Sequence, residues 1–174
     1  MNREKLDKVL KHLLVQAAYP TRIDATVAPF FDPRVTLETF TRVNWSASEI
    51  SVAEVQFQSA EGERKMHMLK FLAKTRTRVV RIGDDGIPPD TQDLNADDVV
   101  LDLYADFAIE YVISGCEPTE LDDEGMAEFT AHNMPYHLWP YFRELAQSTA
   151  LRLRVPIPTI PAFRVPKSHQ AVKK

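Results

Sequence analysis

The hydrophobic pattern of the chain starts with a helical period. Apolar residues recur at spacings of three and four near the beginning, at Leu6, Val9, Leu10, Leu13 and Leu14. This spacing predicts an amphipathic helix over about residues 3–16, with Asn2 as its cap and Pro20 beyond its end. Such a helix either packs onto the rest of the domain or covers an apolar surface.

From residue 34 the period changes to two, which is typical of strands with one buried face. Two strands are predicted here, one with the apolar positions Val35, Leu37, Val43 and Trp45, and one with Ser51, Ala53, Val55 and Phe57. The second is expected to end at the turn-like sequence A-E-G-E. Residues 25–31 could form a further strand, held at a sheet edge by Pro29.

Two more strands combine an apolar face with a charged face. The third carries a basic stripe, formed by Lys70, Lys74, Arg76 and Arg78. The fourth, over residues 99–113, alternates apolar residues with Asp102, Asp106 and Glu110. A basic stripe is typical of phosphate binding. If the two strands pair antiparallel, however, the acids can neutralise most of the stripe, which favours a protein that does not bind nucleic acid.

The second half of the chain is predicted to contain a loop and two helices. Residues 83–98 carry six aspartates and no basic residue, and their glycines and prolines predict a solvated loop. Thr119 and the acids after it predict a short helix over residues 119–131, which Gly125 weakens. A second helix is expected from Pro140 to about Arg154.

An extended apolar segment follows these helices. Pro156, Pro158 and Pro161 exclude both a helix and a central strand. The apolar side chains between and around them are Val155, Ile157, Ile160 and Phe163. We expect an extended strip that lies on another surface of the protein.

The run W-P-Y-F-R-E at residues 139–144 resembles the F/Y-P-Y-x-R-E segment of the SecB family of export chaperones. Only this motif, with Pro140, Tyr141, Arg143 and Glu144, matches residue by residue. The order of strands, acidic connection and helix extends the resemblance over about two-thirds of the chain. It implies an α+β fold with a four-stranded antiparallel sheet and a long C-terminal helix, plus an extra N-terminal helix. We therefore expect a helical extension over residues 1–20, a SecB-like domain over 21–166 and a basic flexible tail over 167–174.

The resemblance also implies an activity and an assembly. SecB-like proteins are ATP-independent chaperones, or holdases, that bind unfolded polypeptides in apolar grooves and form tetramers. The expected partners are unfolded preproteins, passed on to the SecA motor, or a dedicated client such as an antitoxin of a toxin–antitoxin system. Three departures count against SecA: the net charge is only −4, the tail is basic, and no helix is predicted after Phe163. The small residues predicted to let helices of neighbouring subunits approach closely are Ala146, Ser148, Thr149 and Ala150.

We expect the client to bind between the extended strip and the outward face of the helix. The apolar and aromatic side chains concentrated there are Leu138, Trp139, Phe142, Ile157, Ile160 and Phe163. Such side chains tolerate varied clients, because removal of apolar area from water, at about 25 cal/mol per Å², needs no fixed hydrogen-bond partner. The alternative for each of them is a place in the core. Arg143 and Glu144 do not face each other on a helix and are expected to hold strand ends or a neighbouring subunit.

Composition narrows the remaining function classes. The 174 residues are 44% hydrophobic and 26% charged, as in a single globular domain. No apolar run resembles a signal peptide or a membrane span, which favours the cytoplasm. Neither phosphate-binding glycine motif is present, so no nucleotide cofactor is expected. Cys116, His132 and His137 lack the number and spacing of zinc ligands, so no metal is expected. Cys116 and a histidine could form a nucleophile and base, but no orienting group is identifiable, so no enzyme is expected. A self-assembling scaffold and a nucleic-acid-binding protein remain the alternatives.

Overall fold

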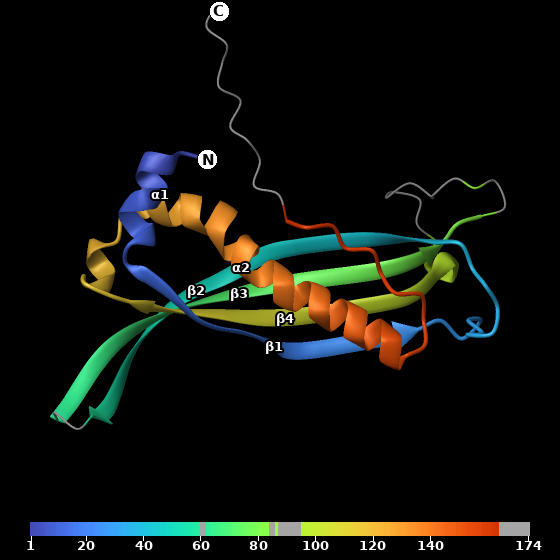
Figure 1. Ribbon diagram of the computed structural model, residues 1–174, viewed down its shortest axis with the longest axis horizontal. Coiled ribbons are helices and arrows are strands. Elements are labelled where there is room, and N and C mark those ends of the chain that lie inside the picture. Colours follow the sequence, from blue (N-terminus) through green and yellow to red (C-terminus); the bar gives the residue numbers. More distant parts are fainter. Residues whose placement is uncertain (60–61, 84–85, 87–94, 164–174) are drawn as a thin grey trace, which may run out of the picture.

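The computed structural model describes residues 1–59, 62–83, 86 and 95–163. In chain order the elements are α1 (Arg3–Leu10), β1 (Leu13–Val27), β2 (Thr39–Ser59), β3 (Gly62–Arg81), η1 (Ala96–Asp98), β4 (Val99–Ile113), η2 (Pro118–Glu120) and α2 (Asp123–Arg152). The four strands form one antiparallel sheet in the order β1-β4-β3-β2, and α2 lies across one of its faces (Figure 1). The predicted α+β fold, with its sheet, long C-terminal helix and additional N-terminal helix, is confirmed. The tail and most of the acidic segment 83–98 lie outside the described residues.

The chain enters the sheet earlier than its helical period predicted. α1 ends at Leu10, and the following chain forms β1, which runs through Pro20. β1 pairs only with β4 in the sheet order, and an edge strand tolerates a proline because one row of its N–H groups needs no ladder partner. The predicted helix over residues 11–16 is wrong, since pairing with β4 outweighs the spacing of Leu13 and Leu14. The strand also crosses residue 20, where the helical extension was expected to end.

α1 is a packing element. Leu6 and Val9 are buried, and α1 contacts the start of α2. Gly125 of α2 makes this contact possible: a Cβ there would lie 2.6 Å from Val9 Cγ2 and 2.7 Å from the carbonyl oxygen of Lys5. Gly125 is therefore a contact point between two helices, and it does not interrupt α2.

β2 replaces the two strands that were expected over residues 34–58. It is continuous from Thr39 to Ser59 and is an edge strand, paired with β3. Residues 34–38 precede it as turn and coil. The break expected between the two strands is a local irregularity within one long strand.

That irregularity is a β-bulge at Ser48. A register shift between Ala47 and Glu49 makes Ser48 an extra residue, and its hydroxyl donates to the Leu72 carbonyl at 3.1 Å. Because an extra residue reverses the alternation that follows it, Ile50 and Val52 pair with two core residues of β3, Phe71 and Leu69. The predicted apolar positions Ser51, Ala53 and Val55 consequently lie on the opposite side of the sheet.

α2 replaces the two helices that were expected over residues 119–154. It runs through Pro135 and Pro140, and the Asp122 carboxylate caps it by accepting from Gly125 N at 2.8 Å. Its sheet-facing side is fully buried, at Phe129, Met134, Leu138, Phe142, Ala146 and Ala150. These contacts hold the helix together where the prolines remove backbone hydrogen bonds. Among the helices of the described chain, none is both long and apolar enough to cross a membrane.

Aromatic packing joins α2 to the middle of the sheet. The rings of Phe71, Tyr111 and Phe129 lie with centroids 5.1–5.9 Å apart. The Tyr111 hydroxyl and His137 Nδ1 are hydrogen-bonded at 2.9 Å. Burial lowers the pKa of the His137 imidazole and raises the pKa of the Tyr111 hydroxyl, because both charged forms lose hydration. This part of the sheet face is a closed core.

The opposite face carries the predicted cross-strand ion pairs. β3 and β4 are antiparallel, and Arg76 lies against Asp102 with two hydrogen bonds, while Lys70 Nζ lies 3.5 Å from Glu110. Two acids of β4 therefore neutralise two bases of β3, as the alternation predicted.

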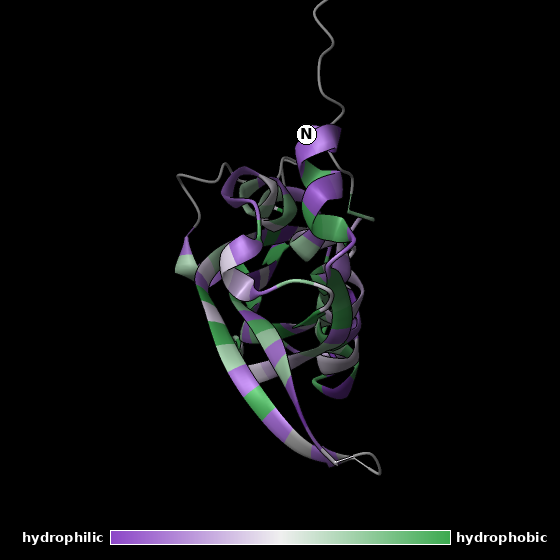
Figure 2. Ribbon diagram, turned by 90° about the vertical axis from the view of Figure 1, so that its left-hand side faces the viewer, coloured by the Kyte–Doolittle hydropathy of each residue, from purple (hydrophilic) through white to green (hydrophobic). Residues whose placement is uncertain are grey.

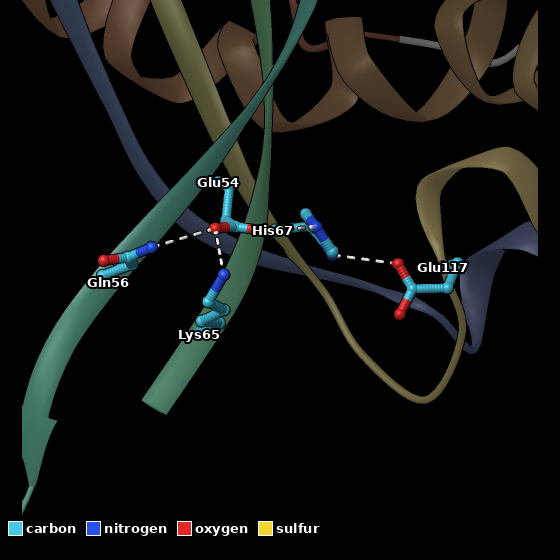
Figure 3. A network of polar contacts seen from close by, with 5 residues as sticks. All are labelled: Glu54, Gln56, Lys65, His67 and Glu117. Carbon is cyan, nitrogen blue, oxygen red and sulfur yellow. Dashed lines mark hydrogen bonds and ion pairs between the residues drawn. The ribbon is translucent and has the colours of Figure 1, made fainter. Parts of the chain in front are cut away.

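The β2–β3 hairpin extends beyond the rest of the sheet (Figure 1), with hydrophobic and hydrophilic residues alternating along it (Figure 2). A polar network at its base includes Glu54, which accepts from Lys65 at 2.8 Å and from Gln56 at 3.2 Å (Figure 3). The Lys65 hydrogen bond lowers the pKa of the Glu54 carboxyl. His67 lies 3.7 Å from Glu54 and 3.6 Å from Glu117. The network thus connects the hairpin to the segment between β4 and α2.

Candidate functional site

The segment after α2, residues 155–163, forms an extended strip along that helix, as predicted; we call it the proline strip. At its start Val155 N donates to the Ala150 carbonyl at 3.1 Å. Near its end the Pro161 carbonyl accepts from Trp139 Nε1 at 2.6 Å. The helix residue that is hydrogen-bonded to the strip is thus Ala150 at the start of the strip and Trp139 near its end. The strip therefore runs antiparallel to α2, toward the helix N-terminal half (Figure 1).

Aromatic rings join the proline strip to both α2 and β2. The Trp139 ring lies 5.3 Å from Phe142 and 5.4 Å from Phe163, and Phe163 lies edge-on to Trp45 at 6.5 Å. Such tilted and edge-to-face pairs are favourable beyond the area they bury. These four residues, Trp45, Trp139, Phe142 and Phe163, form what we call the aromatic cluster. It marks the place where the described strip ends.

The six residues expected to bind a client have three different environments. Leu138, Phe142 and Ile160 are buried in the core. Trp139 and Phe163 are half-buried in the aromatic cluster, and Ile157 is exposed. The three core residues fasten the helix and the strip to the sheet, so only the other three present surface to a client in this conformation.

The four motif residues lie on the outward side of α2. Pro140, Tyr141 and Glu144 are exposed, and Arg143 is half-buried. Pro140, Arg143 and Glu144 line a shallow hollow of about 580 Å³ together with Gln147, Ser148, Leu151 and Ile157. The motif therefore shapes the helix surface that faces away from the sheet.

The small residues of α2 are not arranged as expected. Ala146 and Ala150 are fully buried against the sheet, while Ser148 and Thr149 are half-buried. The outward side instead presents large apolar side chains, with Tyr136 58% and Leu151 66% exposed. Close approach of helices through Ala146 and Ala150 is therefore wrong as a reason for assembly.

An apolar groove opens beside the aromatic cluster, and we call it the β2–α2 groove. Its residues from β2 are Trp45, Ser46, Ala47 and Ile50, and those from α2 are Asp123, Met126, Ala127, Thr130 and Ala131. Its volume is about 520 Å³. The Thr130 hydroxyl donates to the Met126 carbonyl at 2.8 Å, which satisfies its donor within the helix. The surface is therefore mostly apolar, with the Asp123 carboxylate at one end.

The helix-side face of β2 changes from covered to open at this groove. Thr41, whose hydroxyl accepts from Thr159 N of the strip at 2.9 Å, is half-buried, and so is Trp45. Beyond the bulge, Ile50 and Val52 are each 48% exposed. β2 is an edge strand, so a row of its backbone N–H and C=O groups also faces away from the sheet. An extended polypeptide could place side chains in the groove and pair with this edge.

Sequence reasoning missed the β2–α2 groove for two physical reasons. The bulge at Ser48 brings Ile50 to the helix side, and a bulge has no clear sequence signal. The helix wall was assigned to a separate short helix. A usable signal was present nonetheless: Met126, Ala127, Thr130 and Ala131 recur with a helical period.

The cysteine and histidines considered for metal binding have separate partners. His132 Nε2 lies 3.3 Å from the Glu128 carboxylate, and His137 is bonded to Tyr111. Cys116 lies in the segment after β4, where burial raises the pKa of its thiol. Within the described part of the chain, no group of three or more His, Cys, Asp or Glu residues could hold a metal ion.

Among solved structures, the fold is similar to that of the SecB-like chaperone Rv1957 of Mycobacterium tuberculosis, in complex with a ChAD peptide from the Rv1956 HigA1 antitoxin. The similarity covers 94% of this chain and 99% of that chain, with a TM-score of 0.64 and 14% sequence identity. No protein-family model matches the chain, and no curated protein sequence matches it. The chain therefore has a divergent SecB-like fold, the fold that its W-P-Y-F-R-E motif predicted.

Proposed function

We propose that this protein is a cytoplasmic chaperone that holds unfolded polypeptides without ATP, and that clients bind in the β2–α2 groove. The observation that carries the proposal is the open apolar groove beside a strip of extended chain that fills the neighbouring surface. The SecB-like fold supports it, since the similar Mycobacterium tuberculosis chaperone was solved with a peptide of another protein. A client would be bound as extended chain, in the manner of the proline strip.

The proline strip indicates which chains this surface accepts. It buries Val155 and Ile160, and its backbone is held by two side chains, Trp139 and Thr41. Binding of this kind depends mainly on apolar area removed from water, about 25 cal/mol per Å², and tolerates many sequences. Trp139 and Phe163 would extend the client surface past Trp45.

The client is either an unfolded preprotein or a dedicated polypeptide such as an antitoxin. The net charge of only −4 and the basic residues of the tail support a dedicated client over transfer to the SecA motor. Ile157 lies in the hollow on the other side of the strip, and we propose it as a second contact for a long client.

We also propose that the protein assembles as a homo-oligomer, a tetramer, through the outward side of α2. Three large apolar or aromatic side chains of the helix are exposed there: Tyr136, Tyr141 and Leu151. Exposed apolar surface of this extent usually marks an interface. Light scattering coupled to gel filtration tests the assembly, and a monomer at micromolar concentration would contradict it.

The test of client binding uses two matched isoleucines on the two edge strands. Ile50 in β2 is 48% exposed and lines the groove, whereas Ile23 in β1 is 50% exposed and lies away from it. The parent and Ile23→Ser should suppress aggregation of an unfolded reporter protein at stoichiometric ratio without nucleotide. Ile50→Ser should bind the reporter about 5- to 10-fold more weakly, which corresponds to about 1 kcal/mol of lost apolar burial.

Two outcomes would contradict parts of the proposal. A folded parent that suppresses no aggregation, but still assembles, would favour the self-assembling scaffold. Equal activity of Ile50→Ser and Ile23→Ser would show that clients bind outside the groove, with the outward side of α2 as the next surface to examine.

A further inference from the structure

We propose that residues 164–174 of this chain occupy the β2–α2 groove when no client is bound, and that clients compete with them. The inference deepens the proposed function, because the groove is the same site. The docking itself, however, does not depend on whether any client binds.

The path of the proline strip leads to the groove. Its contacts move back along α2 from Ala150 to Trp139. Its last described residue, Phe163, lies against Trp45, which is also a groove residue. A chain that continues in the same direction passes from Trp139 toward Ala127, along the open part of the groove.

The length of the segment is sufficient for this path. Between Met126 and Trp139 the helix rises about 20 Å, at about 1.5 Å per residue. Extended chain covers that distance with about six residues. Residues 164–174 follow Phe163 in the sequence, so the segment is long enough to line the whole groove.

The sequence of the segment repeats a part of the strip that is already docked. The tripeptide R-V-P occurs at residues 154–156 and again at 164–166. Val155 of the first copy is buried against α2. Val165, the matching residue of the second copy, would place the same side chain beyond the aromatic cluster, where the groove begins.

The charges of the segment and the groove are complementary. Residues 164–174 contain Arg164, Lys167, Lys173 and Lys174 and no acid. The one charged residue that lines the groove is Asp123, in the first turn of α2. Its neighbours Asp122 and Glu124 face lysines of α1, whereas Asp123 has no ion pair with any described residue. A lysine of the segment would supply an opposite charge at that end of the groove.

A weak contact is enough for this docking, because the segment is tethered. A short linker gives an effective concentration in the millimolar range. A segment with a millimolar dissociation constant would therefore fill the groove for about half of the time and weaken client binding about 2-fold. A segment that binds about 10-fold more tightly would weaken client binding about 10-fold.

The docking is tested on the full chain with the triple variant Arg164→Glu, Val165→Ser and Lys167→Glu. Amide chemical shifts of the client-free variant are compared with those of the parent by NMR. We expect differences at Ala47, Ile50, Met126 and Ala127, and none at Tyr104 on the opposite face of the sheet. Unchanged groove amides would overturn the inference, and so would differences that depend on protein concentration, which would indicate docking between copies.

Competition is tested by titrating a reduced, alkylated, unfolded protein into the parent and the triple variant. The variant should bind about 2- to 10-fold more tightly, and an excess of a synthetic peptide of residues 164–174 should return its affinity to that of the parent. Equal affinities would overturn the competition. If the groove amides respond but neither protein binds the unfolded chain, the proposed function fails and the docking stands.

Discussion

The helix-side face of β2 has a covered half and an open half. In the covered half, the proline strip lies over Thr41 and Trp45 and buries its own Val155 and Ile160. In the open half, past the bulge at Ser48, Ile50 and Val52 keep nearly half of their surface in contact with solvent. Both halves lie between the same strand and the same helix. They differ only in whether extended chain covers the apolar surface.

The comparison shows how an open apolar surface arises next to a core. The covered half is stabilised because apolar residues of the strip leave water, and the open half offers the same gain to another segment. Burial in the first half and binding in the second would thus use one physical effect. Substitutions in the covered half should change stability, and substitutions in the open half should change binding.

The largest expected effect is a loss of stability when the packing of the covered half is disrupted. Ile160→Ala removes a buried side chain and should lower the free energy of unfolding by about 2–5 kcal/mol, the range for buried aliphatic residues. Ile50→Ala in the open half should lower it by less than about 1 kcal/mol, since Ile50 is half exposed. Urea unfolding of the two variants measures the contrast. Equal losses would show that the two halves are not distinct.

The next effect concerns the helix that forms the wall of the open half. Gly125→Ala should lower the free energy of unfolding by about 1–3 kcal/mol, because the new Cβ would overlap Val9 Cγ2 and the Lys5 carbonyl. Thermal unfolding measures it. The same substitution should cost less in a Val9→Ala background, where part of the overlap is gone. A stabilised Gly125→Ala would mean that helix propensity outweighs the contact.

A smaller effect separates the hydrogen bond of the strip from its ring contacts. Trp139→Phe keeps an aromatic ring but removes the donor to the Pro161 carbonyl, and should cost about 0.5–1.5 kcal/mol in urea unfolding. Trp45→Phe, which keeps the edge contact with Phe163, is the control and should cost less. A larger loss of stability in Trp45→Phe than in Trp139→Phe would show that the strip is held mainly by its ring contact with β2.

The smallest expected effect is a pH dependence of the covered core. Burial lowers the pKa of His137 in the folded state, so below an unfolded-state pKa of about 6.5 the unfolded chain binds more protons. Stability should therefore fall as the pH decreases from 7.5 to 5.5. His137→Gln should flatten this dependence in urea unfolding at the two pH values. If the unfolding free energy of His137→Gln changed with pH as much as that of the parent, the pH dependence would come from other groups.

The sheet core was predictable because its pattern is local and strong. Alternation along β3 and β4 indicated both strands and the pairing of a basic face with an acidic one, to which the contact of Arg76 with Asp102 belongs. β1 was not predictable from local pattern, because Leu13 and Leu14 fit a helical period and Pro20 argues against a strand. Only pairing with β4, far away in the sequence, decides its structure.

The candidate site was predictable only in part. The concentration of apolar residues around Trp139 and Phe163 indicated the surface that borders the β2–α2 groove. Leu138 and Phe142 are equally apolar, and no local signal tells which side of α2 faces the sheet. The strand wall of the groove depends on the bulge at Ser48, which is a property of pairing with β3.

The bulge at Ser48 also gives β2 one residue that its pairing with β3 does not use. Deleting that residue would remove the extra position and leave Glu49 opposite Leu72 and Ile50 opposite Phe71. Ile50 and Val52 would stay on the helix side, because the strand would then alternate regularly from Ala47 onward. A single in-frame deletion at this codon would thus straighten the strand and leave the wall of the groove unchanged.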